Sequence, residues 1–191
     1  MRITISGKPG AGKTTIAKLL AERLKLKFYE IGKIAQKIAL RRGITIGELM
    51  QQARTDPSID KEIDASQQNL GKEDDFIIDG RISWHFIPNA THIFLDVEEK
   101  TAAQRIFHKH RESDEPAYKS VSEVQKDIHK RLLANREQYL KYYAIDYLDT
   151  KNYHIIIDTT RKSQDQVLAE AIKKITLQEH TPSKSPPGPA R

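Results

Sequence analysis

The feature of this chain that most constrains its fold is a glycine-rich segment at residues 7–14, GKPGAGKT. It fits the pattern G-x-x-x-x-G-K-[S/T] of a phosphate-binding loop. Residues 3–5 before it have the character of a short buried strand, and residues 14–24 after it have the apolar spacing of an amphipathic helix. Strand, turn and helix together predict a phosphate-binding loop, because a turn that binds nothing would match the motif and both flanks only by chance.

The residue types in this loop suit phosphate chemistry. Glycines let the backbone curl so that successive N–H groups point at one anion, and the helix that follows adds its positive end. Pro9 stiffens the loop. Lys13 supplies a mobile positive charge for the outer phosphates of a nucleotide, and the Thr14 hydroxyl is a ligand for the Mg²⁺ that accompanies it. The loop therefore predicts a nucleotide-binding protein.

The composition is that of a globular protein with one main core. The chain has 191 residues, of which 38% are hydrophobic and 30% charged, and it has no cysteine. No apolar stretch is long enough to span a bilayer, and no signal-peptide pattern is evident. We expect a cytoplasmic protein with no membrane association and no disulfides.

The formal net charge is +6, and the basic residues are spread along the chain. A net positive charge of this kind favours the binding of any polyanionic ligand. Basic residues are not interleaved with aromatic ones as in proteins that stack nucleic-acid bases. We therefore expect a nucleotide ligand, with no nucleic acid as partner.

Strand and helix patterns alternate along the chain, which is typical of an α/β fold with a parallel sheet covered by helices. Acidic residues end or directly follow three of the strands, at the edge where ligands bind in such sheets. The expected strands are 2–6, 27–29, 76–79, 92–95 and 154–158, and the expected helices are 13–24, 32–42, 46–54, 58–70, 101–111, 121–142 and 163–175.

Three segments stand apart from this alternation. Residues 31–72 are helical and strongly polar, and they read as an insertion between the second and third strands. Residues 112–120 form a polar, proline-containing break between two charged helices, which favours an exposed loop. Residues 178–191 are rich in proline and are expected to be disordered. Residues 1–177 are then a single domain.

Several arginines are placed where phosphoryl transfer would use them. Such transfer depends on positioning and on neutralising phosphate charge, for which the arginine fork is well suited. Arg81 follows Asp79 and Gly80 at the end of the third strand. Asp79 is a candidate for binding Mg²⁺ through water, for orienting Arg81 or a substrate hydroxyl, or for capping a helix. The other candidates for the transferring group are Arg105, Arg111, Arg131 and Arg136.

Other nucleotide-binding classes fit less well. The chain lacks the Asn-Lys-x-Asp stretch with which GTPases read their base, and it has no repeat that suggests a ring ATPase. Asp96, after the fourth strand, is expected to cap the helix that follows. A small kinase that closes over its substrate suits the length, with one helical insertion and one polar loop.

These features resemble the nucleoside monophosphate kinases, and most closely the short cytidylate kinases typical of archaea. The likeness covers about residues 1–175. The combination of DGR at a strand end with YYAID and IIDTT is more specific than the loop alone. The matching stretches are 3–15, 56–67 (DPSIDKEIDASQ), 76–81 (FIIDGR), 93–105 (IFLDVEEKTAAQR), 142–146 (YYAID) and 156–160 (IIDTT).

The resemblance implies transfer of a phosphoryl group from ATP to CMP or dCMP with Mg²⁺. It implies a P-loop kinase core with a five-stranded parallel sheet, a monophosphate-binding insertion at about residues 31–72 and a LID at about 112–120. Arg81 with Asp79 would hold the acceptor nucleotide, and Thr14 with Asp79 the metal. Arg105, Arg111 and Arg131 would match LID arginines. ATP would lie on Gly7, Lys8, Pro9, Gly10, Ala11, Gly12, Lys13, Thr14 and Thr15.

The chain departs from the family pattern at three points. Lys33 and Gln36 replace an acid and an arginine near the first insertion helix, so Lys33, Lys37 or Arg41 would have to supply an acceptor-phosphate contact. Ala144 replaces a usual glycine, and the LID stretch is longer. Two alternatives stay open: a kinase for AMP, UMP or a small alcohol, and a nucleotide-dependent RNA-binding or assembly factor.

Overall fold

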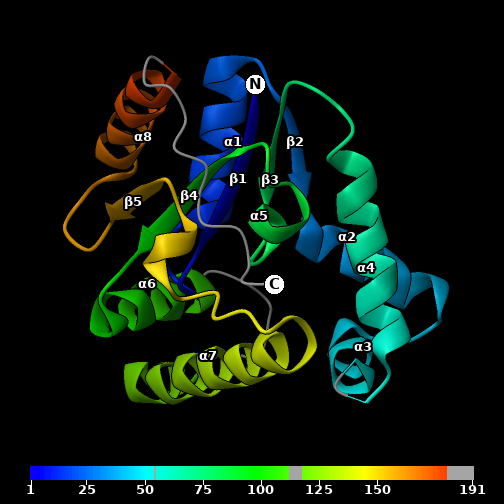
Figure 1. Cartoon of the computed structure of the whole chain (residues 1–191). Helices are drawn as coiled ribbons and strands as arrows, with labels where there is room; N and C mark the ends of the chain where they lie inside the picture. Colours follow the sequence, from blue (N-terminus) through cyan, green and yellow to red (C-terminus); the bar gives the residue numbers. More distant parts are fainter. Residues whose placement is uncertain (54, 112–117, 180–191) are drawn as a thin grey trace.

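The protein is built around a five-stranded parallel sheet with the strand order β2-β3-β1-β4-β5 (Figure 1). The computed structural model describes residues 1–53, 55–111 and 118–179, without the side chains at 110, 111 and 179. The predicted α/β fold with five parallel strands is confirmed. The strands are β1 (Arg2–Gly7), β2 (Lys27–Glu30), β3 (Phe76–Asp79), β4 (Thr91–Asp96) and β5 (Ile155–Asp158).

The helices follow the sequence pattern closely, with ends that shift by a few residues. Two short elements, α5 and the 3₁₀ helix η1, were not predicted from the sequence. The last helix continues to Glu179, beyond the start of the expected tail. The helical elements are α1 (Lys13–Leu24), α2 (Ile31–Arg41), α3 (Ile46–Gln52), α4 (Pro57–Leu70), α5 (Ser83–Phe86), α6 (Glu99–Arg111), α7 (Val121–Tyr143), η1 (Thr150–Asn152) and α8 (Gln164–Glu179).

The main core lies on the three central strands. Ile3, Ile5, Ile77, Ile93 and Leu95 are all fully buried. Because helices cover both faces of a parallel sheet, its strands are apolar on both sides, as the sequence runs in β1, β3 and β4 indicate. At about 25 cal/mol per Å² of apolar surface, burial of such side chains is the main stabilising contribution to the sheet.

Register places the ends of the strands at one edge. Ile5 pairs with Asp79, Gly7 with Leu95, and Asp96 with Asp158. In Figure 1 this edge faces α6 and α7, and the phosphate loop leaves it from the end of β1. Ligands of open α/β sheets bind at this carboxyl edge.

The insertion has a small core of its own. Helices α2, α3 and α4 lie to one side of the sheet (Figure 1) and bury Ala35, Ile38, Ala39, Leu49 and Ile59 between them. Local signals fix the helix ends. A capping box starts α3, and a proline follows the Asp N-cap of α4. The division into core, insertion and LID stays a prediction.

Parts of two predicted segments lie outside the described residues. These are 112–117 of the expected LID and 180–191 of the expected tail. Helix α7 begins after Ser120, whose side chain accepts a hydrogen bond from the Glu123 N–H at 3.2 Å. No helix among the described residues is long and apolar enough to cross a membrane.

Candidate active site

The phosphate loop is shaped by three glycines with positive φ. Gly7, Gly10 and Gly12 have φ values of 143°, 76° and 84°. A Cβ on Gly7 would lie 2.1 Å from the Leu95 carbonyl oxygen, and one on Gly10 would lie 2.8 Å from Ala102. Close packing against β4 and α6 therefore requires glycine at both positions.

The loop leads directly into the N-terminus of α1. Gly12 is the N-cap residue and makes no side-chain cap, so the first N–H groups of α1 point toward the loop. The Lys13 ammonium donates to the Lys8 carbonyl at 3.2 Å. Burial lowers the pKa of Lys13 to about 8; Asp79 opposes this shift, and Arg81 and Arg131 add to it.

A hydroxyl and a carboxylate meet beside Lys13. The Thr14 hydroxyl donates to Asp79 Oδ2 at 2.5 Å, and Asp79 is 7% exposed. Two such oxygens are hard ligands of the kind that Mg²⁺ binds. No group of three His, Asp or Glu among the described residues could hold a metal alone. These oxygens therefore fit a Mg²⁺ ion that takes its remaining ligands from phosphate and water.

Arg81 is positioned by the turn that follows β3. A Cβ on Gly80 would lie 2.1 Å from the Ser83 hydroxyl, so only glycine fits there. The Ser6 hydroxyl donates to the Arg81 carbonyl at 2.7 Å, which ties this turn to β1. The Arg81 side chain hydrogen-bonds the hydroxyl of half-buried Tyr139, and it lies close enough to Lys13 to lower the pKa of that residue.

Of the arginines predicted from the sequence, Arg81 and Arg131 are the two placed with Lys13. Arg131 on α7 lies 3.8 Å from Asp127 and acts on Lys13 electrostatically. The structure thus gathers Lys13, Thr14, Asp79, Arg81 and Arg131 from β3, α1 and α7. This constellation combines the glycine-rich loop with three cations and two oxygens of the type that bind Mg²⁺.

The Arg105 guanidinium contacts both the phosphate loop and the turn after β5. Its guanidinium donates to the Thr159 hydroxyl at 3.0 Å and to the Thr159 carbonyl at 2.6 Å, with a longer contact to the Gly10 carbonyl at 3.4 Å. In this conformation Arg105 links the phosphate loop to the turn after β5. All its described partners are oxygens of the protein, so its expected role at the transferring group stays a prediction.

The other predicted arginines either form an ion pair with a carboxylate or have a side chain outside the described residues. Arg136 binds Asp146 Oδ2 through two nitrogens, at 3.0 and 2.6 Å. Arg41 pairs with Glu62 at 2.7 Å on the exposed side of the insertion. The Arg111 side chain is outside the described residues.

Asp96 forms an ion pair with the phosphate loop and does not cap the helix that follows. Its carboxylate pairs with Lys8 at 2.6 Å and accepts the Val97 N–H at 2.8 Å. Helix α6 begins later, at Glu99, so the expectation that Asp96 caps it is wrong. Within the loop, Ala11 is buried and Thr15 exposed.

Sequence reasoning missed a group of polar side chains between α4 and α7. Asp60 accepts from Gln138 at 2.9 Å, and Asp64 accepts from the Tyr143 hydroxyl at 2.5 Å. Four-residue spacing on a helix places the two aspartates on one face, and that spacing is the only local signal. Their partners are nearly eighty residues away in the chain.

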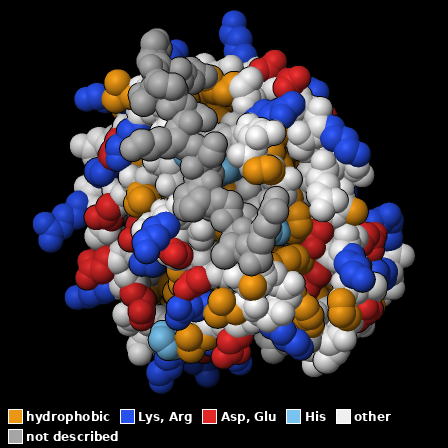
Figure 2. Space-filling model, viewed as in Figure 1, with side chains coloured by type: hydrophobic (Ala, Val, Ile, Leu, Met, Phe, Trp, Pro, Cys, Tyr) orange, Lys and Arg blue, Asp and Glu red, His pale blue; other side chains and the backbone are white. Residues whose placement is uncertain are grey.

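The side chains on the visible face match the prediction that charge is spread. Figure 2 shows Lys and Arg dispersed over the described part of this face among acidic side chains, with no continuous basic area.

The sheet order, the phosphate loop and the helices around them define a P-loop kinase fold. A shikimate kinase from Acinetobacter baumannii, solved with shikimate, has a TM-score of 0.60 with this structure at 17% identity and covers 95% of each chain. At that identity the likeness concerns the fold alone.

The chain belongs to the cytidylate kinase-like family, whose model matches residues 2–161. The cytidylate kinase of Pyrococcus furiosus is 35% identical over 168 residues, which cover 87% of this chain and 84% of that protein. An S-adenosylmethionine-dependent nucleotide dehydratase of Lacinutrix mariniflava is 30% identical over 168 residues. The matched region is only 34% of that longer relative.

Proposed function

We propose that this protein transfers the γ-phosphoryl group of ATP to CMP or dCMP. The observation that carries the proposal is the gathering of Lys13, Asp79, Arg81 and Arg131 at the phosphate loop. Two nucleotides bring several phosphates together, and clustered cations with few partners suit that charge. The cytidylate kinase relatives at about one-third identity support CMP as the acceptor.

The loop residues Gly7 to Thr15 would bind the ATP phosphates through backbone N–H groups. Thr14 and Asp79 would hold Mg²⁺, which supplies neutralisation of the β- and γ-phosphates when bound. Arg81, at the end of β3, would bind the acceptor phosphate. Asp79 would keep Arg81 and Lys13 in place through opposite charge.

The reaction needs little from the protein beyond positioning. An acceptor phosphate oxygen is already anionic at neutral pH, so no strong general base is required. Lys13, Arg81 and Arg131 would stabilise charge on the transferring group, and the partly buried setting would strengthen each interaction. We further propose a monomer, with the insertion at residues 31–72 covering the acceptor and the LID at 112–120 covering the donor.

The proposal is tested by an acceptor panel. Purified protein is incubated with ATP, Mg²⁺ and one monophosphate at a time, and ADP release is followed by a coupled assay. We expect CMP and dCMP to accelerate ADP release most strongly. A larger kcat/KM with AMP, UMP or a small alcohol would reassign the acceptor, and no acceleration by any acceptor would overturn the kinase proposal.

A further inference from the structure

A fully buried hydrogen bond joins the insertion to the turn that carries Arg81. The Ser83 hydroxyl, at the start of α5, donates to Gln67 Oε1 of α4 at 2.7 Å. Ser83 is 0% exposed and Gln67 is 2% exposed. The bond therefore connects the last turns of α4 to the segment that follows β3, out of reach of solvent.

The glutamine lies on the face of α4 that packs inward. Ile59 and Gln67 are the buried residues of this helix, and their spacing in the sequence places them on one face. An apolar side chain would pack there without needing a partner, whereas a buried amide must be hydrogen-bonded. A paired buried polar group adds little net stability, but it favours a single geometry. The glutamine is therefore better explained by the position it gives to the turn than by stability.

The turn between β3 and α5 has no spare room. A Cβ on Gly80 would lie 2.1 Å from Ser83 Oγ and 2.7 Å from Ile31 Cγ1. Ile31 is the first residue of α2, so the insertion contacts the turn through this residue as well. From the sheet, the Ser6 hydroxyl of β1 donates to the Arg81 carbonyl at 2.7 Å. The backbone at Arg81 is thus held by both the sheet and the insertion.

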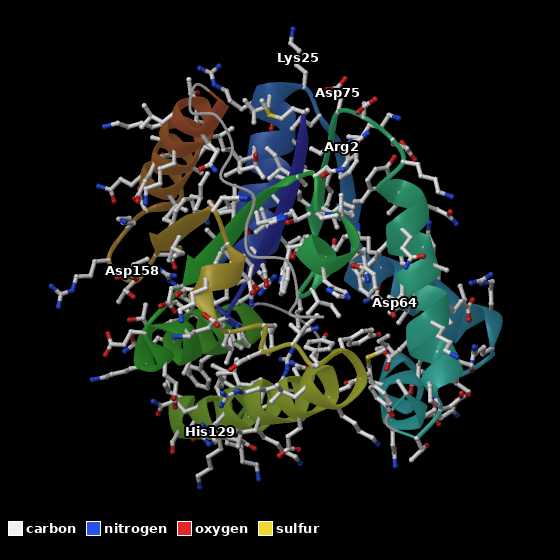
Figure 3. All side chains as sticks on the ribbon, in the orientation of Figure 1. Arg2, Lys25, Asp64, Asp75, His129 and Asp158 are labelled. Atoms are coloured by element: carbon white, nitrogen blue, oxygen red, sulfur yellow. The ribbon has the colours of Figure 1, made fainter. Side chains whose placement is uncertain are left out.

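Hydrogen bonds continue from α4 to α7. Gln67 Nε2 donates to Asp64 Oδ1 at 3.4 Å, and the Tyr143 hydroxyl donates to the other oxygen of Asp64 at 2.5 Å. Figure 3 labels Asp64 on the side of α4 turned toward the rest of the molecule. Helix α7 also carries Arg131, one of the cations at the phosphate loop. One line of contacts therefore runs through α5, α4 and α7 and reaches both segments that bring arginines to the loop.

We propose that Gln67 is a positioning residue, which holds Arg81 in place for the acceptor phosphate through its bond to Ser83. The inference rests on the proposed kinase function and adds a residue that does not touch the substrate. Gln67 is buried and its Oε1 accepts from Ser83, so it acts through the turn. An arginine that is already arranged for a phosphate loses less freedom on binding, which raises affinity. Acceptor binding should therefore depend on how α4 packs against α5.

The test breaks the bond from each end, in Ser83→Ala and in Gln67→Met. Methionine is flexible and unbranched like glutamine but has no amide. We expect the KM for CMP, at saturating ATP, to rise about tenfold in both variants, while the KM for ATP stays within about twofold of wild type. Calorimetric titration with CMP alone should show the same loss of affinity. Either variant decides the question if the other does not fold.

The double variant Ser83→Ala/Gln67→Met tests whether the two residues act as one unit. Each single variant already removes the same bond, so we expect the KM for CMP in the double variant to match that of the more affected single variant. Its melting temperature should be no lower than that of either single variant, because no buried polar group is left unpaired. Effects on KM that multiply would show two independent contributions and would overturn the inference.

Ile59→Val is the matched control on the same helix. It removes one carbon from the buried face of α4 and leaves the bond between Gln67 and Ser83 in place. We expect a lower melting temperature with wild-type KM values for CMP and ATP.

The inference fails if the two single variants raise neither KM value or raise both equally, because the pair would then only stabilise the fold. It also fails if Ile59→Val raises the KM for CMP as far as Ser83→Ala does. A wild-type protein that binds CMP but releases no ADP in its presence would instead refute the proposed function. The calorimetric comparison of CMP affinities would still decide the role of Gln67.

Discussion

The phosphate loop at residues 7–14 is held by backbone geometry, whereas the face of α4 with Asp60 and Asp64 is held by side chains from a distant helix. Three positive φ values and two close approaches to neighbouring backbone shape the loop. The α4 contacts join residues 78 and 79 positions apart. The first arrangement can be recognised from eight consecutive residues, while the second exists only after the chain has folded.

The largest effect is expected at the loop. Lys13→Ala removes the charge that the loop directs at the outer phosphates, so we expect kcat to fall about 10³-fold. The fold should persist, because the side chain makes a single described hydrogen bond, to the Lys8 carbonyl. ADP release with the best acceptor and a thermal melt measure the two quantities. Turnover near that of wild type would remove Lys13 from the mechanism.

Two ionisable groups, His92 in β4 and Asp64 in α4, should change the stability in opposite directions as the pH falls. His92 in β4 is 1% exposed, and burial with the neighbouring His154 lowers its pKa to about 3. Below its ordinary value of about 6.5, the unfolded chain binds a proton that the folded chain refuses, so stability falls by about 1.4 kcal/mol per pH unit. The pKa of Asp64 is raised, so the folded chain takes up a proton first. The free energy of unfolding therefore rises as the pH falls through about 6.

Urea unfolding at pH 7 and pH 5 separates these contributions. His92→Asn should flatten the loss of stability on acidification, and Asp64→Asn should steepen it because the opposing gain is absent. Parallel curves of stability against pH for wild type and both variants would contradict the opposite signs assigned to His92 and Asp64.

A region can be predicted from the sequence when the residues that determine its structure are close together in the chain. The strands and long helices follow from apolar runs, from caps such as Asp56 before Pro57, and from the glycines of the loop. The orientation of Arg81 does not, because it depends on a glycine packed against Ser83 and on a bond from Ser6. Nor do the contacts of Arg105, which donates to the hydroxyl of Thr159, a residue 54 positions further along the chain.

A smaller effect distinguishes two glycines within the loop. An alanine at Gly10 would adopt φ of 76° and place its Cβ 2.8 Å from Ala102, while one at Gly12 would adopt 84° with open space around it. Gly12→Ala should cost about 1–2 kcal/mol of stability from the left-handed backbone alone. Gly10→Ala should cost at least about 1 kcal/mol more, since packing must also shift. Equal losses in the free energy of unfolding for the two variants, measured with urea, would show that α6 can move to accommodate the added Cβ at no cost.

The smallest effect is expected on the α4 side. Tyr143→Phe leaves Asp64 half-buried without its principal donor, so we expect a loss of about 1–2 kcal/mol in the free energy of unfolding. The loss should shrink at pH 5, where the carboxyl group is protonated and needs no donor. Urea titrations at both pH values provide the measurement, and a loss independent of pH would argue against a charged Asp64 at neutrality.

The most direct test of the central claim is a crystal structure with a non-hydrolysable ATP analogue, Mg²⁺ and CMP. We predict the triphosphate on the N–H groups of residues 7–14 with Lys13 beside it, and the CMP phosphate on Arg81. An empty loop, or an Arg81 side chain turned into solvent while CMP is bound elsewhere, would contradict the account.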